Sequence, residues 1–83
     1  MQKTLFSQGN RIFLRLLREA REDARVTQEQ LAEQLGTTQS FVSKCERGER
    51  RLDIVELRAW CKALKLSFPS FVLKFDKASD KKS

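Results

Sequence analysis

The sequence has no histidine and no tyrosine, and its 83 residues include one proline, three glycines and two cysteines. Without histidine the chain lacks the most common general base and metal ligand, and without tyrosine it lacks a phenolic acid or nucleophile. No other residues pair a nucleophile with a base. We therefore expect no enzyme, no cofactor, no metal and no small-molecule substrate.

The two cysteines, Cys45 and Cys61, stand without another cysteine or any histidine to complete a ligand set. Their spacing fits neither a zinc site nor a redox C-x-x-C pair. We interpret them as buried free thiols in a reducing cytosol.

Long apolar runs are also missing. The first residues offer only Leu5 and Phe6 toward a signal peptide, and the apolar run from Ile12 to Leu17 is broken by Arg15. We expect a cytoplasmic protein without membrane contact.

What the sequence does have is a positive charge and enough apolar residues for one core. Lys and Arg outnumber Asp and Glu by 17 to 11, a net charge of +6, and 40% of the residues are apolar. A chain of this length folds as one small domain, and a basic one suits a polyanionic partner. The charge is spread along the chain, so its arrangement matters more than its total.

Helical periodicity dominates the sequence and strand signals are nearly absent. Capping boxes at Thr27 with Gln30 and at Asp53 with Glu56 predict two helix starts. Thr37 and Thr38 offer another helix start. The expected helices cover about residues 10–24, 28–35, 39–47, 54–64 and 68–75.

Apolar residues at helical spacing predict the buried face of each helix. In the first helix these are Phe13, Leu17, Ala20 and Ala24, and in the third they are Val42 and Cys45. The fold class is therefore all-α, a compact bundle of five short helices over residues 10–75. Residues 1–9 would form an N-terminal arm and residues 76–83 a flexible basic tail.

The second and third helices are joined by a short turn that contains a glycine, as in helix-turn-helix proteins. The segment TQEQLAEQLGTTQSFVSKCERGERRLD, from Thr27 to Asp53, resembles the Cro and lambda-repressor type of helix-turn-helix proteins, the XRE family. The residues that carry the resemblance are Ala32, Gly36, Val42, Ser43, Glu46 and Gly48. The flanking LREAREDAR and ELRAWCKALKL segments also match, so the resemblance covers about residues 9–73 and implies a lambda-repressor-like DNA-binding domain.

The outer face of the third helix is polar, which suits contacts with the edges of bases. A glutamine can pair with adenine and a lysine can donate to guanine, while serine hydroxyls serve bases or phosphates. The resemblance implies base readout by Gln39, Ser40 and Lys44, and we expect Ser43 on the same face to take part. The resemblance also implies a phosphate contact of Gln28, and the other expected phosphate contacts are Thr38, Arg47, Arg50 and Arg51. The alternative is a solvated polar face without a ligand.

Other residues are assigned structural roles. The resemblance implies an ion pair of Arg21 with Glu46 between the first and third helices, and the alternative is two exposed, unpaired charges. Phe41 could belong to the core or to the rim that faces DNA. Arg25 and Lys65 stand where the family often has glycine at helix ends, so we expect those two turns to be built differently.

Together these features predict a sequence-specific regulator of transcription that binds double-stranded DNA and acts as a repressor in a bacterium or phage. The third helix would lie in the major groove. A homodimer on a palindromic operator is expected, with Val72 and Phe75 at the interface beside residues of the fourth helix. The alternative function is a protein-interaction module on the same fold, either antitoxin-like or coactivator-like.

Overall fold

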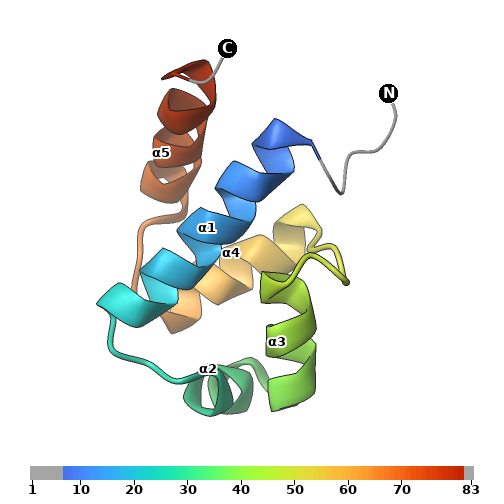
Figure 1. Ribbon diagram of the computed structural model, residues 1–83. Helices are drawn as coiled ribbons and strands as arrows, with labels where there is room; N and C mark the ends of the chain where they lie inside the picture. Colours follow the sequence, from blue (N-terminus) through green and yellow to red (C-terminus); the bar gives the residue numbers. More distant parts are fainter. Residues whose placement is uncertain (1–6, 82–83) are drawn as a thin grey trace.

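The computed structural model describes residues 7–81, and within this range it contains five α-helices and no strand (Figure 1). The helices are α1 (Gln8–Asp23), α2 (Gln28–Leu35), α3 (Gln39–Glu46), α4 (Ile54–Ala63) and α5 (Phe68–Lys81). The all-α prediction is confirmed.

Each of the first four helices begins at a side chain that accepts a hydrogen bond from a free backbone N–H. Ser7 accepts from Asn10, and Thr38 accepts from Phe41. The two predicted capping boxes, at Thr27 and Asp53, are both complete. Thr38 rather than Thr37 is thus the residue that starts α3.

The same four helices end in one motif. A residue with positive φ and the residue after it each donate a backbone N–H to a carbonyl in the last turns of the helix. The positive φ angles are 59° at Arg25, 72° at Gly36, 82° at Gly48 and 60° at Lys65. After α1, Arg25 donates to the Glu22 carbonyl and Val26 to the Arg21 carbonyl. Our expectation that the turns at Arg25 and Lys65 would differ is wrong, because the same pair of backbone hydrogen bonds forms there with the left-handed conformation and without glycine.

The two outer helices are longer than predicted. Helix α1 starts at Gln8 because Ser7 caps it, so residues 7–9 do not belong to an arm. Residues 1–6 of that arm lie outside the described residues. Helix α5 continues to Lys81, through much of the expected tail, because Ala78 packs against the core one turn after Phe75 and neither proline nor glycine follows.

The core lies between α1, α3 and α4 and is closed by α2 and α5. Its fully buried side chains are Leu17, Leu31, Val42, Cys45, Trp60 and Cys61. In α1 the prediction missed Ile12, which is buried, and included Ala24, which is exposed. The apolar stripe is shifted toward the N-terminus because α5 covers that part of α1.

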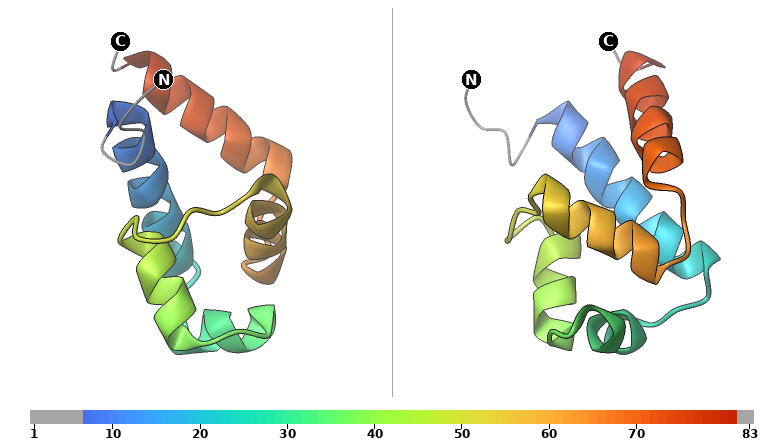
Figure 2. Two further views of the ribbon diagram at one scale, coloured as in Figure 1. Left: turned by 90° about the vertical axis from the view of Figure 1, so that its right-hand side faces the viewer. Right: turned by 180° about the vertical axis from the view of Figure 1, so that it is seen from behind.

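The arrangement separates two surfaces. Helix α2 packs on α3 and α4, whereas α5 packs on α1 and α4. The views in Figures 1 and 2 agree that α3 and α5 lie apart from each other, with α1 and α4 between them. A ligand on α3 and a partner on α5 would therefore not compete for one surface.

Candidate nucleic-acid interface

The turn between α2 and α3 places the two helices for a helix-turn-helix. Gly36 adopts the left-handed conformation that ends α2, and its N–H and that of Thr37 donate to carbonyls of the last turn. Ala32 is buried, which lets the short helices approach closely. The turn thereby leaves one face of α3 on the surface.

Helix α3 divides its residues as predicted from the sequence. Val42 and Cys45 are buried in the core, whereas Gln39, Ser40 and Lys44 are exposed. Ser43 differs from these three because it is half-buried and its Oγ accepts a hydrogen bond from Arg47 Nη1. Burial raises the pKa of the Cys45 thiol to about 11, so this cysteine stays a neutral core residue.

Behind this face, the structure places Arg21 and Glu46 in a two-point ion pair. Arg21 Nε lies 2.7 Å from Glu46 Oε2 and Nη2 lies 3.1 Å from Oε1. Arg21 Nη1 also donates to the Val26 carbonyl at 2.9 Å. The side chains are 11% and 4% exposed, and the hydrogen bond with Glu46 raises the pKa of Arg21. The pair joins the end of α1 to the end of α3.

The same carboxylate reaches the start of α2 and, through it, the start of α3. Gln28 Nε2 donates to Glu46 Oε1 at 3.0 Å, and Gln39 Nε2 donates to Gln28 Oε1 at 2.7 Å. Gln28 was expected to contact phosphate and Gln39 a base. The structure brings them together, and no spacing in the sequence indicated that their amides would pair.

Two of the arginines expected to contact phosphate are paired with carboxylates that the sequence reading missed. Arg47 Nε lies 2.9 Å from Glu49 Oε2, and Arg50 Nη1 lies 2.7 Å from Glu56 Oε1. These hydrogen bonds lower the pKa of Glu49 and of Glu56. Both pairs face solvent, where water and salt screen the attraction between the charges, so each arginine can exchange its carboxylate for another anion.

Phe41, which was left open between the core and the rim that faces DNA, has one contact with the core and one with an arginine. It is half-buried and packs against the core, and the Arg50 guanidinium lies 4.9 Å from the centre of its ring. This cation–π contact holds Arg50 beside the N-terminal half of α3.

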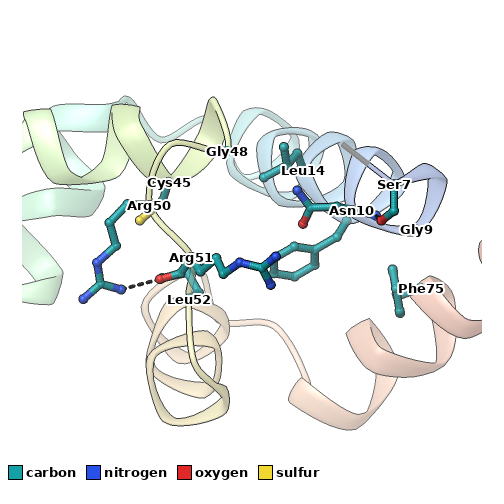
Figure 3. Close-up of a pocket in the computed structure, with 11 residues that line it drawn as sticks. Ser7, Gly9, Asn10, Leu14, Cys45, Gly48, Arg50, Arg51, Leu52 and Phe75 are labelled. Atoms are coloured by element: carbon teal, nitrogen blue, oxygen red, sulfur yellow. Dashed lines mark hydrogen bonds between the residues drawn. The ribbon is translucent and has the colours of Figure 1, made fainter. Parts of the chain in front are cut away.

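Lys44 and Arg51 have no side-chain hydrogen bond or ion pair to any of residues 7–81. Figure 3 shows Arg50 and Arg51 leaving the loop between α3 and α4 in opposite directions. Arg51 borders a cavity of about 360 Å³ between that loop, the start of α1 and Phe75 of α5. Lys44 thus lies in the last turn of α3 and Arg51 in the loop that follows it, while Thr38 is exposed at the other end of the helix.

The residues expected at a dimer interface lie on α5, away from α3. Val72 is 42% exposed and open to a partner. Phe75 is half-buried, with its ring centre 6.1 Å from that of Phe13 in an edge-to-face contact. Phe75 therefore contributes much of its surface to this chain's own packing.

Comparison with known proteins agrees with this geometry. Residues 12–69 match the family described as helix-turn-helix domain. Among solved structures, the chain is similar to an XRE-family like protein from Pseudomonas syringae pv. tomato str. DC3000, with 41% identity and a TM-score of 0.78. The match covers 82% of this chain and 83% of that one. No curated protein matches.

Within residues 7–81 no helix is both long enough and apolar enough to cross a membrane. The matched families are families of regulators rather than of enzymes. By its helix-turn-helix match and its similarity over most of both chains, the protein belongs to the XRE family of DNA-binding regulators.

Proposed function

We propose that the protein is a sequence-specific repressor that binds double-stranded DNA in the cytoplasm with α3 in the major groove. The observation that carries the proposal is the exposed polar face of α3, formed by Gln39, Ser40 and Lys44, directly beside Gln28 at the start of α2. In this docking, the first residues of the second motif helix reach base edges while the other motif helix crosses the backbone.

The exposed residues of α3 supply the chemistry for reading bases. Gln39 carries an acceptor and donors on one amide, and Lys44 carries donors alone, which suits guanine O6 and N7. Ser40 can donate or accept. Ser43 has a smaller share in this readout, because its hydroxyl is half-buried and bonded to Arg47.

Residues around the two ends of α3 supply the contacts to phosphates. Gln28 and Thr38 lie beside the start of the helix, and the three arginines Arg47, Arg50 and Arg51 follow its end. The free N–H groups at the start of α2 favour an anion beside Gln28. Arg51 needs no rearrangement, whereas Arg47 and Arg50 would exchange a carboxylate for a phosphate.

We further propose that two copies bind a palindromic operator, with Val72 at the interface and Phe75 at its edge. One module reads only a few base pairs, and a two-fold dimer doubles that number. The half-sites would then lie about 10 base pairs apart. Occupation of such an operator excludes other proteins from it, which is the basis for proposing a repressor.

Selection of bound fragments from a random DNA library tests this function. We expect an enriched site with two-fold symmetry. Lys44→Ala should relax the preference at one base pair of each half-site, whereas Arg51→Ala should weaken binding to all sequences and reduce the salt slope by about one unit. Equal losses on selected and random DNA for both variants would contradict this division of roles. Absence of any salt-sensitive DNA binding would favour a protein-interaction module.

A further inference from the structure

Four side chains from α1, α2 and α3 form one continuous chain of hydrogen bonds, Arg21 to Glu46 to Gln28 to Gln39. The buried end is an ion pair and the exposed end is a residue proposed to read a base. We infer that Glu46 is a positioning residue that sets the base preference of Gln39, through Gln28. The inference rests on the proposed function.

The first step is that Glu46 can only accept hydrogen bonds. Its carboxylate is 4% exposed and is held at both oxygens by the Arg21 guanidinium. A carboxylate has no donor, so any third group that binds Oε1 must bring an N–H or O–H. Glu46 is thus a fixed acceptor beside the start of α2.

The second step is that this acceptor orients the Gln28 amide. Gln28 has a donor end and an acceptor end, and only the donor end, Nε2, can bind Glu46. The acceptor end, Oε1, is therefore turned toward α3. There it accepts the hydrogen bond from Gln39 Nε2 at 2.7 Å.

The third step is that the Gln28 oxygen orients Gln39. One N–H of Gln39 Nε2 is used, which leaves one N–H donor and the Oε1 acceptor for DNA. Adenine presents one acceptor, N7, and one donor, N6, whereas guanine presents two acceptors, N7 and O6. The amide held in this orientation matches adenine and leaves its oxygen opposed to guanine O6.

Removal of the Glu46 acceptor should therefore release the whole chain of hydrogen bonds. The Oε1 position accepts from both Arg21 Nη2 and Gln28 Nε2, so an amide in Glu46→Gln would keep its oxygen there and leave Gln28 oriented. In Glu46→Leu no acceptor remains, and the Gln28 amide can turn either way. Gln39 then has no fixed partner and can present either its oxygen or its N–H donors to a base.

The test compares sites selected from a random DNA library by the wild type and three variants. Gln39→Ala identifies the base pair that Gln39 reads. At that position we expect the wild type to prefer adenine over guanine by about tenfold or more. Glu46→Leu should reduce or abolish this preference. Arg21→Lys is the matched control, because it weakens the same ion pair but leaves the Glu46 carboxylate facing Gln28, so the adenine preference should remain.

Thermal melting followed by circular dichroism identifies a temperature at which every variant is folded, and the selections are carried out there. Differences between the selected sites then report base preference and not loss of the folded state. If Glu46→Leu does not fold, Gln28→Met removes the link at a less buried position and should relax the same preference. An unchanged adenine preference in Glu46→Leu, or in Gln28→Met, overturns the inference while the proposed function stands. A wild type that selects no DNA overturns both.

Discussion

At the scale of single residues, the two glycines that end α2 and α3 have the same backbone conformation but different surroundings. A Cβ added at Gly36 would meet no atom within 4 Å, whereas one added at Gly48 would lie 2.8 Å from Leu14 Cδ1. Gly36 is therefore required for its φ of 72° alone, and Gly48 for its φ of 82° and for the contact of the α3–α4 loop with α1.

We predict that Gly48→Ala lowers the free energy of unfolding more than Gly36→Ala. The left-handed conformation costs alanine about 1 to 2 kcal/mol at either position. Overpacking against Leu14 adds about 1 to 3 kcal/mol at Gly48. Urea unfolding of the two variants measures both losses, and equal losses would show that Leu14 moves aside freely.

The buried thiol of Cys45 should make the free energy of unfolding fall at alkaline pH. Burial raises the pKa of its thiol from 9.0 to about 11, so the folded protein keeps a proton that the unfolded chain releases. The stabilising effect is complete below pH 9 and is lost as the pH rises toward 11. Urea midpoints from pH 8 to 11 should fall more steeply for the wild type than for Cys45→Ala. Parallel curves would mean that Cys45 does not contribute.

At the scale of helices, the starts of α2, α3 and α4 were readable from the sequence because a cap acts on the backbone three residues away. The cap of α1 at Ser7 was missed. The conformation of the turns at Arg25 and Lys65 was not readable, because the same double hydrogen bond forms there without the glycine that usually marks it. The end of α5 depended on Ala78, whose burial follows from contact with another part of the fold.

The ion pair between α1 and α3 should contribute far more to the free energy of unfolding than an exposed ion pair on α1 itself. Arg21→Ala leaves the Glu46 carboxylate buried without its cation, and such a loss costs about 3 to 5 kcal/mol. Arg15→Ala breaks an exposed pair with Glu19 on the same helix, which costs about 0.5 kcal/mol or less. Thermal and urea unfolding compare the two variants. A similar loss for both would contradict a buried structural role for Arg21.

At the scale of the whole molecule, the proposed DNA surface on α3 and the proposed dimer surface on α5 are separate, since α5 packs on α1 and α4 (Figure 2). Val72 and Leu73 of α5 are 42% and 53% exposed, and Ile54 and Val55 at the start of α4 are 68% and 73% exposed. With Leu66 between α4 and α5, which is 38% exposed, these are the exposed large apolar residues among residues 7–81 where a second copy could bury apolar area.

We predict that Val72→Glu weakens self-association while the monomer stays folded. The introduced carboxylate would be buried in the interface without an opposite charge beside it, and the cost of removing it from water opposes dimer formation. Val55→Glu is the matched control, with the same substitution at an exposed position on another helix. Sedimentation at tens of micromolar, with and without operator DNA, measures the effect. Dimers that survive Val72→Glu but not Val55→Glu would place the interface on α4.

The helices, the caps of α2, α3 and α4, the buried face of α3 and the helix-turn-helix itself follow from patterns within a few residues of one another. Local hydrogen bonds and side-chain periodicity act over that range, so these features were correctly predicted. The partners of the site residues lie farther apart along the chain: Gln39 binds Gln28, Gln28 binds Glu46 and Glu46 binds Arg21, at separations of 11, 18 and 25 residues. The pairing of Phe75 with Phe13 is of the same kind. Such contacts exist only after the helices have packed, because packing determines which side chains meet and which way each amide faces.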